Sequence, residues 1–167
     1  MKAILVVIDM QEKIAGHVEG IEEVKKKIEK IIKAFEIFNF PIIYTRQIKL
    51  GKPLYGSHFI EKSTFSCWKE RKFVEEIEKL GIKRVVLVGI ETHICVIQTA
   101  IHMKKDGYEV EVAVDATSSR NKNDKEIAIE RMKQEGIKLT SVEMLIYELM
   151  ESASHEKFKD ILAIIKE

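Results

Sequence analysis

The chain has 167 residues, with 28 Lys and Arg against 27 Asp and Glu, a formal net charge of +1; this length fits one globular domain, 1–167. A hydrophobic fraction of 46% excludes a disordered chain, and the balanced charge argues against a nucleic-acid partner, whose phosphates attract clustered Lys and Arg. Two cysteines, Cys67 and Cys95, are too few for a disulfide framework or a cysteine-rich zinc site, and they indicate a reducing compartment.

The N-terminal part of the chain predicts a strand, a helix and a second strand. Residues 3–8 form an uninterrupted apolar run, which is typical of a parallel strand buried on both faces. The run is too short for a signal peptide or a membrane span, so we expect a cytoplasmic protein without membrane contact. An amphipathic helix is expected from Ile21 to near Asn39, and a strand at 42–45 follows Pro41.

The rest of the chain continues this alternation after a polar loop. The expected elements are a helix at 73–80, a strand at 84–89, a helix from about 93 to 105, a strand at 109–114, a helix at 124–134, a strand at 138–141 and a C-terminal packing helix through 158–165. Alternating strands and helices predict right-handed crossovers and a parallel sheet covered on both faces. The length favours an open, doubly wound α/β sheet over an eightfold barrel, which needs about 250 residues.

Reactive side chains follow three of the predicted strands, at the sheet edge where doubly wound folds bind ligands. They are Asp9, the turn 89–95, and the segment from Asp115 to Arg120. Cys95 lies in the first turn of its expected helix, where free N–H groups and the macrodipole lower the pKa of a thiol. This placement favours a nucleophilic thiol with Asp9 as general base. A buried packing role for Cys95 and a capping role for Asp9 are the alternatives.

Several motifs occur in order along nearly the whole chain. They are VIDMQ at 7–11, KSTFS at 62–66, GIETHICVIQTA at 89–100, DGYEV at 106–110 and DATSSR at 115–120. Together they resemble the isochorismatase-like cysteine hydrolase superfamily. The tail, with AIERMKQEG at 128–136 and SHEKFK at 154–159, resembles its isochorismatase-domain-containing subgroup. The resemblance implies a Rossmann-like, three-layer fold with a six-stranded parallel sheet, and it implies a homo-oligomer.

The resemblance also implies a reaction and the residues that perform it. The catalytic triad is Asp9, Lys62 and Cys95, and the peptide bond before Glu91 is cis. The backbone N–H groups of Glu91 and Cys95 form the oxyanion hole, while the Glu91 side chain is expected to turn away. These roles describe hydrolysis of a small amide through an acyl-enzyme on Cys95. A catalytically idle member of the fold, which binds a small molecule or serves as a scaffold, is the alternative function.

The chain departs from the nicotinamidases of this superfamily in the interval between Arg46 and Glu61. That interval holds His58 alone and no aspartate, whereas nicotinamidases carry an Asp-x-His metal motif with further histidines. We therefore expect no metal, no cofactor and a substrate other than nicotinamide. Retention of the cysteine argues against the vinyl-ether reaction of isochorismatases proper.

The aromatic and thiol side chains that follow Lys62 are candidates for the substrate pocket. Phe65, Cys67 and Trp68 are expected to form its walls, because an aromatic ring beside the lysine can stack on a flat acyl group. Ordinary core packing is the alternative for all three.

Overall fold

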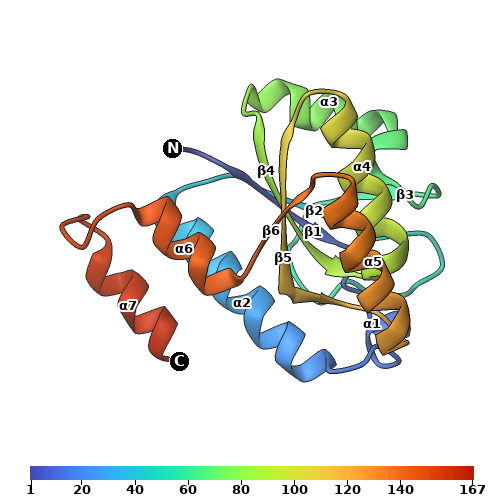
Figure 1. Ribbon diagram of the computed structural model, residues 1–167, viewed down its shortest axis with the longest axis horizontal. Helices are drawn as coiled ribbons and strands as arrows, with labels where there is room; N and C mark the ends of the chain where they lie inside the picture. Colours follow the sequence, from blue (N-terminus) through green and yellow to red (C-terminus); the bar gives the residue numbers. More distant parts are fainter.

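The computed structural model describes residues 1–167 as a single six-stranded sheet in the order β3-β2-β1-β4-β5-β6 (Figure 1). Every neighbouring pair of strands is parallel. The strands are β1 (Ile4–Ile8), β2 (Ile42–Gln47), β3 (Phe59–Lys62), β4 (Arg84–Ile90), β5 (Glu109–Ser118) and β6 (Lys138–Thr140). The strand order reverses direction between β1 and β4, so the switch point of the fold lies between these two central strands.

Seven helices cover the two faces of the sheet. They are α1 (Glu12–Ala15), α2 (Ile21–Phe38), α3 (Arg71–Leu80), α4 (Ile97–Lys105), α5 (Lys122–Gln134), α6 (Val142–Met150) and α7 (Phe158–Lys166). Figure 1 shows α2, α6 and α7 on one side of the sheet and α3, α4 and α5 on the other. This arrangement confirms the predicted doubly wound, three-layer α/β fold.

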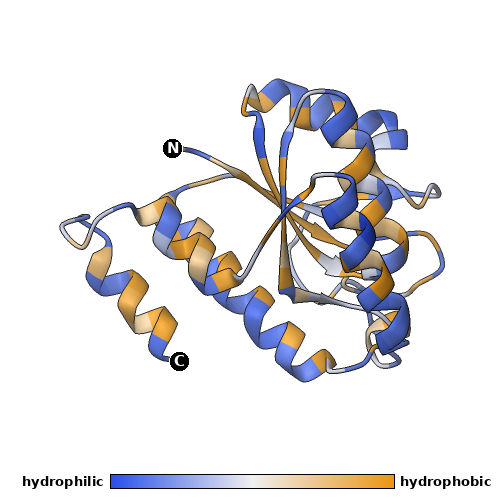
Figure 2. Ribbon diagram, viewed as in Figure 1, coloured by the Kyte–Doolittle hydropathy of each residue, from blue (hydrophilic) through white to orange (hydrophobic).

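Successive side chains of β1 point to opposite faces of the sheet, so this strand contributes to the apolar cores on both sides. Leu5 and Val7 belong to the apolar core beneath α2 and α6, whereas Ile4, Val6 and Ile8 belong to the core beneath α3, α4 and α5. Figure 2 shows the hydrophobic residues concentrated on the central strands and on one face of the surrounding helices. None of the seven helices combines the length and the apolar character needed to cross a bilayer.

The residue pattern misses three elements, the short helix α1, the strand β3 and the helix α6. Strand β3 is a four-residue edge strand with an exposed Glu61, so it shows no apolar run, although the family resemblance correctly implies six strands. Helix α6 has the buried spacing of an amphipathic helix, but its exposed face carries the apolar Met144 and Tyr147, so the contrast between its two faces is weak. The helix expected from about 93 is also different at its start, where the π-helical turn Thr92–Val96 precedes α4.

Gly89 is required where β4 passes close to β1. Its φ is +113°, and a Cβ added there would lie 2.2 Å from the carbonyl oxygen of Ile8. We expect Gly89→Ala to lower the free energy of unfolding by about 2–4 kcal/mol, because backbone strain and a backbone clash act together. Urea unfolding followed by circular dichroism measures this change. Gly16→Ala is the matched control, since Gly16 has φ −64° and no neighbour within 4 Å of the new Cβ; an equal loss in both variants would contradict the prediction.

Candidate active site

Asp9, Lys62 and Cys95 come together at the carboxyl edge of the sheet. Asp9 directly follows β1, Lys62 is the last residue of β3, and Cys95 lies in the π-helical turn after β4. The Lys62 Nζ is 2.8 Å from Asp9 Oδ2 and 3.5 Å from Cys95 Sγ. All three side chains are buried. The structure thus gathers the three residues beside the switch point, where open parallel sheets bind ligands.

The Asp9 carboxylate is fixed from one side and open on the other. The Thr45 hydroxyl donates a hydrogen bond to Oδ1 at 2.9 Å and accepts one from the Asp9 N–H at 3.3 Å. Asp9 has φ 49°, a left-handed conformation that Asp tolerates better than most residues. Oδ2 contacts the Lys62 ammonium but accepts no well-aligned hydrogen bond. This oxygen therefore keeps a lone pair for another proton.

Lys62 is held as a buried ammonium. It donates hydrogen bonds to the carbonyl oxygens of Thr64 at 3.1 Å and Phe65 at 2.9 Å, and to Oε1 of Gln47. Burial alone lowers the pKa of Lys62, but the charge of Asp9 and the two neighbouring thiols outweigh it, so the pKa is raised. The ammonium is therefore charged at neutral pH and acts on its neighbours as a fixed positive charge.

The thiol of Cys95 is neutral in the resting protein. Burial, followed by the negative charge of Asp9, raises the pKa of Cys95, and the Lys62 charge opposes this only in part. The expectation that the helix N-terminus lowers this pKa is therefore wrong, because desolvation of a thiolate at a site that is 7% exposed is the larger effect. The thiol contacts the Lys62 ammonium, as Asp9 Oδ2 does. Its proton must leave as the sulfur attacks.

The backbone between β4 and the π-helical turn has a cis peptide bond, Ile90–Glu91, at the position that the family resemblance implies. Glu91 is 6% exposed and lines the same cavity as Cys95. Its carboxylate is paired with Arg120, whose side chain follows β5 and was not assigned a role from the sequence.

A cavity of about 310 Å³ opens over Cys95 and Asp9. Phe65 lines it, as expected from the sequence. The apolar lining residues are Ile14, Ile48, Leu50, Phe65, Ile90 and Ile94, and the polar ones besides Asp9 and Cys95 are Gln47, Glu91 and Arg120. A volume of this size accommodates a small molecule rather than a polymer segment.

Cys67 and Trp68 do not line this cavity, which corrects the sequence expectation. The Cys67 side chain is fully buried, with Sγ 4.0 Å from the Thr45 hydroxyl oxygen. Its backbone N–H donates to the Thr99 hydroxyl at 2.9 Å. The 3-10 turn Cys67–Lys69 begins two residues after Phe65, and its Trp68 lines a different cavity. Cys67 therefore has a packing position behind the triad.

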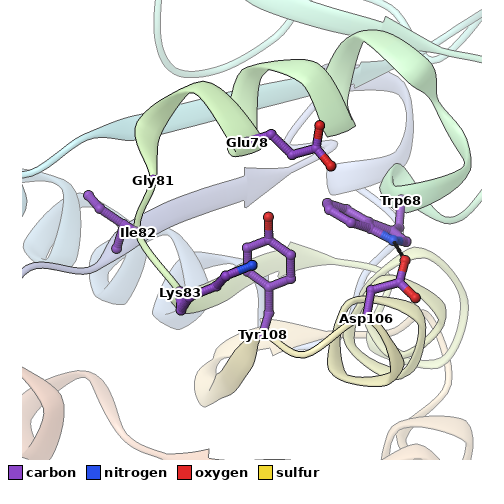
Figure 3. Close-up of a pocket in the computed structure, with 7 residues that line it drawn as sticks. All are labelled: Trp68, Glu78, Gly81, Ile82, Lys83, Asp106 and Tyr108. Atoms are coloured by element: carbon purple, nitrogen blue, oxygen red, sulfur yellow. Dashed lines mark hydrogen bonds between the residues drawn. The ribbon is translucent and has the colours of Figure 1, made fainter.

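Trp68 lies in a different cavity, of about 520 Å³, which Figure 3 shows. Its ring meets that of Tyr108 edge to face, with centroids 5.1 Å apart, and its indole N–H donates to Asp106. Lys83 Nζ lies 4.2 Å from the centroid of the Tyr108 ring. Lys83 and Tyr108 directly precede β4 and β5, so this cavity is at the amino edge of the sheet, opposite Cys95.

The buried Cys67 makes the stability of the fold sensitive to alkaline pH. Burial is the main cause that raises the pKa of Cys67 from 9.0 to about 11. The folded state then holds a proton that the unfolded state releases, so the stabilising contribution is complete below pH 9 and is lost as the pH rises toward 11. Over this pH interval we expect the free energy of unfolding to fall in both proteins. The fall should be smaller in Cys67→Ala than in the unmodified protein, by about 2–3 kcal/mol.

Urea titrations at the two ends of that pH interval measure the difference. Lys62 also has a raised pKa and contributes to the alkaline loss in both proteins, so only the difference between the two slopes reports on Cys67. Identical slopes in Cys67→Ala and the unmodified protein would contradict the assignment.

No group of three or more His, Cys, Asp or Glu side chains is arranged to hold a metal ion. His58, the single histidine of the interval between β2 and β3, instead lies next to Ser57, with Nδ1 3.1 Å from the Ser57 hydroxyl oxygen. It lines a separate surface pocket that does not include Cys95.

Comparison with known proteins assigns the chain to a family. The sequence pattern of the isochorismatase domain matches residues 3–52 and 48–144. Isochorismatase family protein 1B of Dictyostelium discoideum is 31% identical, over 98% of this chain and 85% of that protein. The structure of the MAR1 ribonuclease from Caenorhabditis elegans is 32% identical with a TM-score of 0.92, over 99% of this chain and 90% of that one.

A more distant structure shares the fold. The YcaC gene product of Escherichia coli, described as an octameric hydrolase of unknown specificity, is 20% identical with a TM-score of 0.86, over 99% of this chain and 94% of that one. The family pattern and the two closer relatives span both the sheet and the residues gathered at its carboxyl edge. The chain therefore belongs to the isochorismatase domain family.

Proposed function

We propose that the protein is a cysteine hydrolase that cleaves the C–N bond of a small amide through an acyl-enzyme on Cys95. One observation carries the proposal. The neutral thiol of Cys95 and an open oxygen of the Asp9 carboxylate both lie within 3.5 Å of the Lys62 ammonium, at the floor of a small cavity. A nucleophile and a general base that both contact one orienting charge fit the arrangement that covalent catalysis requires.

The positions of these groups support the following acylation half of the reaction. Asp9 Oδ2 accepts the thiol proton as Cys95 Sγ forms a bond to the amide carbonyl carbon. The backbone N–H groups of Glu91 and Cys95 stabilise the oxyanion of the tetrahedral intermediate. Asp9 then returns its proton to the amide nitrogen, the C–N bond breaks, and the amine or ammonia leaves. The product on the enzyme is a thioester.

Deacylation reverses these proton movements. Asp9 accepts a proton from a water molecule as the water oxygen attacks the thioester carbonyl carbon. The two N–H groups again stabilise the tetrahedral intermediate. The C–S bond breaks, Cys95 regains its proton from Asp9, and the carboxylic acid product leaves. Lys62 stays protonated throughout and stabilises whichever of Asp9 and Cys95 carries the negative charge. No step uses a metal or a cofactor.

Release of ammonia from a panel of small primary amides, with a chelator present, tests this function. We expect turnover of at least one amide that is unchanged by the chelator and absent when Cys95 is replaced. Binding of amides without any release of ammonia would favour the alternative, a catalytically idle member that binds a small molecule. Single-stranded RNA belongs in the panel because the C. elegans relative is named a ribonuclease; cleavage of RNA that depends on Cys95 would overturn the amide proposal.

We also propose that the protein is a homo-oligomer. The E. coli YcaC protein is described as octameric, and two apolar side chains at the cavity, Phe65 and Ile48, are 57% and 40% exposed. Burial of such side chains against another subunit would remove apolar area from water. Light scattering should give a mass that is a multiple of 19.3 kDa, and a monomer would contradict the proposal.

A further inference from the structure

The cavity over Cys95 contains charged groups only in pairs. Asp9 is paired with Lys62 behind the cavity floor. On the wall, the carboxylate of Glu91 is paired with Arg120, whose backbone N–H donates to Oε2 at 2.9 Å. The Arg120 Nε lies 3.1 Å from Oε2 and 3.0 Å from Oε1 of the same carboxylate. Each negative charge that lines the cavity therefore has a cation in direct contact.

The Glu91–Arg120 pair differs from the surface ion pairs of the protein in its burial. Glu91 is 6% exposed, whereas Arg120 is 56% exposed and reaches the carboxylate from the solvent side. His93 is the next nearest titratable group, with Nδ1 3.9 Å from Glu91 Oε2 and 2.8 Å from the Ser119 hydroxyl oxygen. Asp124 lies beyond it, 4.0 Å from His93 Nε2. Arg120 is thus the group that neutralises the Glu91 carboxylate.

The remaining walls offer an entering molecule apolar surface. They are formed by Ile14, Ile48, Leu50, Phe65, Ile90 and Ile94. A charged group that enters such a cavity loses water and finds no unpaired charge of opposite sign to replace it. An apolar group of the same size gives up no favourable hydration, and its burial removes apolar area from water.

We infer that the substrate is an uncharged amide with an apolar acyl group, and that the Glu91–Arg120 pair sets this charge preference. The inference rests on the proposed hydrolysis of amides and specifies their class. It predicts opposite changes in charge preference when either member of the pair is removed. Removal of Arg120 leaves a negative charge on the wall, which attracts cationic substrates, and removal of the Glu91 charge leaves a positive one, which attracts anionic substrates.

Three primary amides of matched length test the inference: pentanamide, succinamate and γ-aminobutyramide, which are neutral, anionic and cationic. For the unmodified protein we expect kcat/KM for pentanamide to exceed the other two by about tenfold or more. Glu91→Gln should raise the kcat/KM for succinamate relative to that for pentanamide by about tenfold. Arg120→Gln should raise the kcat/KM for γ-aminobutyramide, relative to that for pentanamide, by about tenfold. The double variant should return to the original order, because the wall is again neutral.

Glu75→Gln is the matched control. It removes a carboxylate from an exposed ion pair with Arg71 on α3, remote from the cavity, and should leave all three ratios unchanged. The comparison uses ratios between substrates, so a general loss of activity in the Glu91 variants does not affect it. Equal or better turnover of a charged amide by the unmodified protein, or ratios that do not respond to the two single variants, would overturn the inference.

Binding to the Cys95→Ala protein separates this inference from the proposed function. Calorimetry with the same three amides reports charge preference without turnover. Preference for pentanamide in binding, with no hydrolysis by the unmodified protein, would reject the proposed function and retain the inference. Hydrolysis of all three amides at equal rates, with equal binding, would retain the function and reject the inference. Absence of both binding and hydrolysis for all three would reject both.

Discussion

Cys95→Ala is expected to lower kcat for any amide substrate by at least about 10⁴-fold, because the substitution removes the atom that forms the covalent bond. The fold should be retained. The Cys95 side chain is small, and its 7% exposure reflects contact with the cavity, so the free energy of unfolding should fall by no more than about 1 kcal/mol. Steady-state kinetics with ammonia detection, together with urea unfolding, measure both quantities.

Cys67→Ala provides the matched control for this result. The two thiols are both buried and both near Lys62, but only Cys95 lines the cavity. We expect Cys67→Ala to keep kcat within a few-fold of the unmodified protein. Comparable loss of activity in both variants would show that the effect comes from repacking around Lys62, and full activity in Cys95→Ala would reject the mechanism.

Lys62→Met is expected to destabilise the fold by about 3–5 kcal/mol, because the substitution leaves the buried Asp9 carboxylate without its cation. The methionine fills a similar volume, so lost packing contributes little. Hydrolysis should fall by at least about a hundredfold as well, since nothing then stabilises the negative charge that moves between Asp9 and Cys95. Urea unfolding near neutral pH and kinetics at the same pH measure the two effects.

A second substitution separates charge from shape in this result. Asp9→Asn combined with Lys62→Met removes both charges, so the double variant should be more stable than Lys62→Met alone. It should remain inactive, because an amide cannot accept the thiol proton. If Lys62→Met alone were as stable as the unmodified protein, the ion pair between Lys62 and Asp9 would not have the structural role assigned to it.

The sequence predicts two members of the proposed triad from local pattern and the third only from the family resemblance. Asp9 and Cys95 follow β1 and β4, whose apolar runs are unmistakable. Lys62 ends β3, an edge strand of four residues that are mostly only partly buried, and the chain contains many other lysines. Periodicity therefore cannot distinguish Lys62 from the other lysines, whereas the motif KSTFS at 62–66 identifies it.

The parts of the site that sequence reasoning misses depend on contacts between distant segments. Glu91 and Arg120 are 29 residues apart, and their pairing arises because β4 and β5 are neighbours in the sheet. Trp68 is near Phe65 in sequence, yet the 3-10 turn at 67–69 separates their surroundings. The raised pKa of Cys95 likewise follows from burial, which no linear pattern measures.

Rapid-quench mass spectrometry of the intact protein during turnover of its preferred amide tests the central claim most directly. We predict a transient species heavier by one acyl group, which peptide mapping assigns to Cys95, and diversion of product to the hydroxamate when hydroxylamine is added. Turnover in which the protein keeps its unmodified mass at every time point, and in which hydroxylamine diverts no product, would contradict an acyl-enzyme on Cys95.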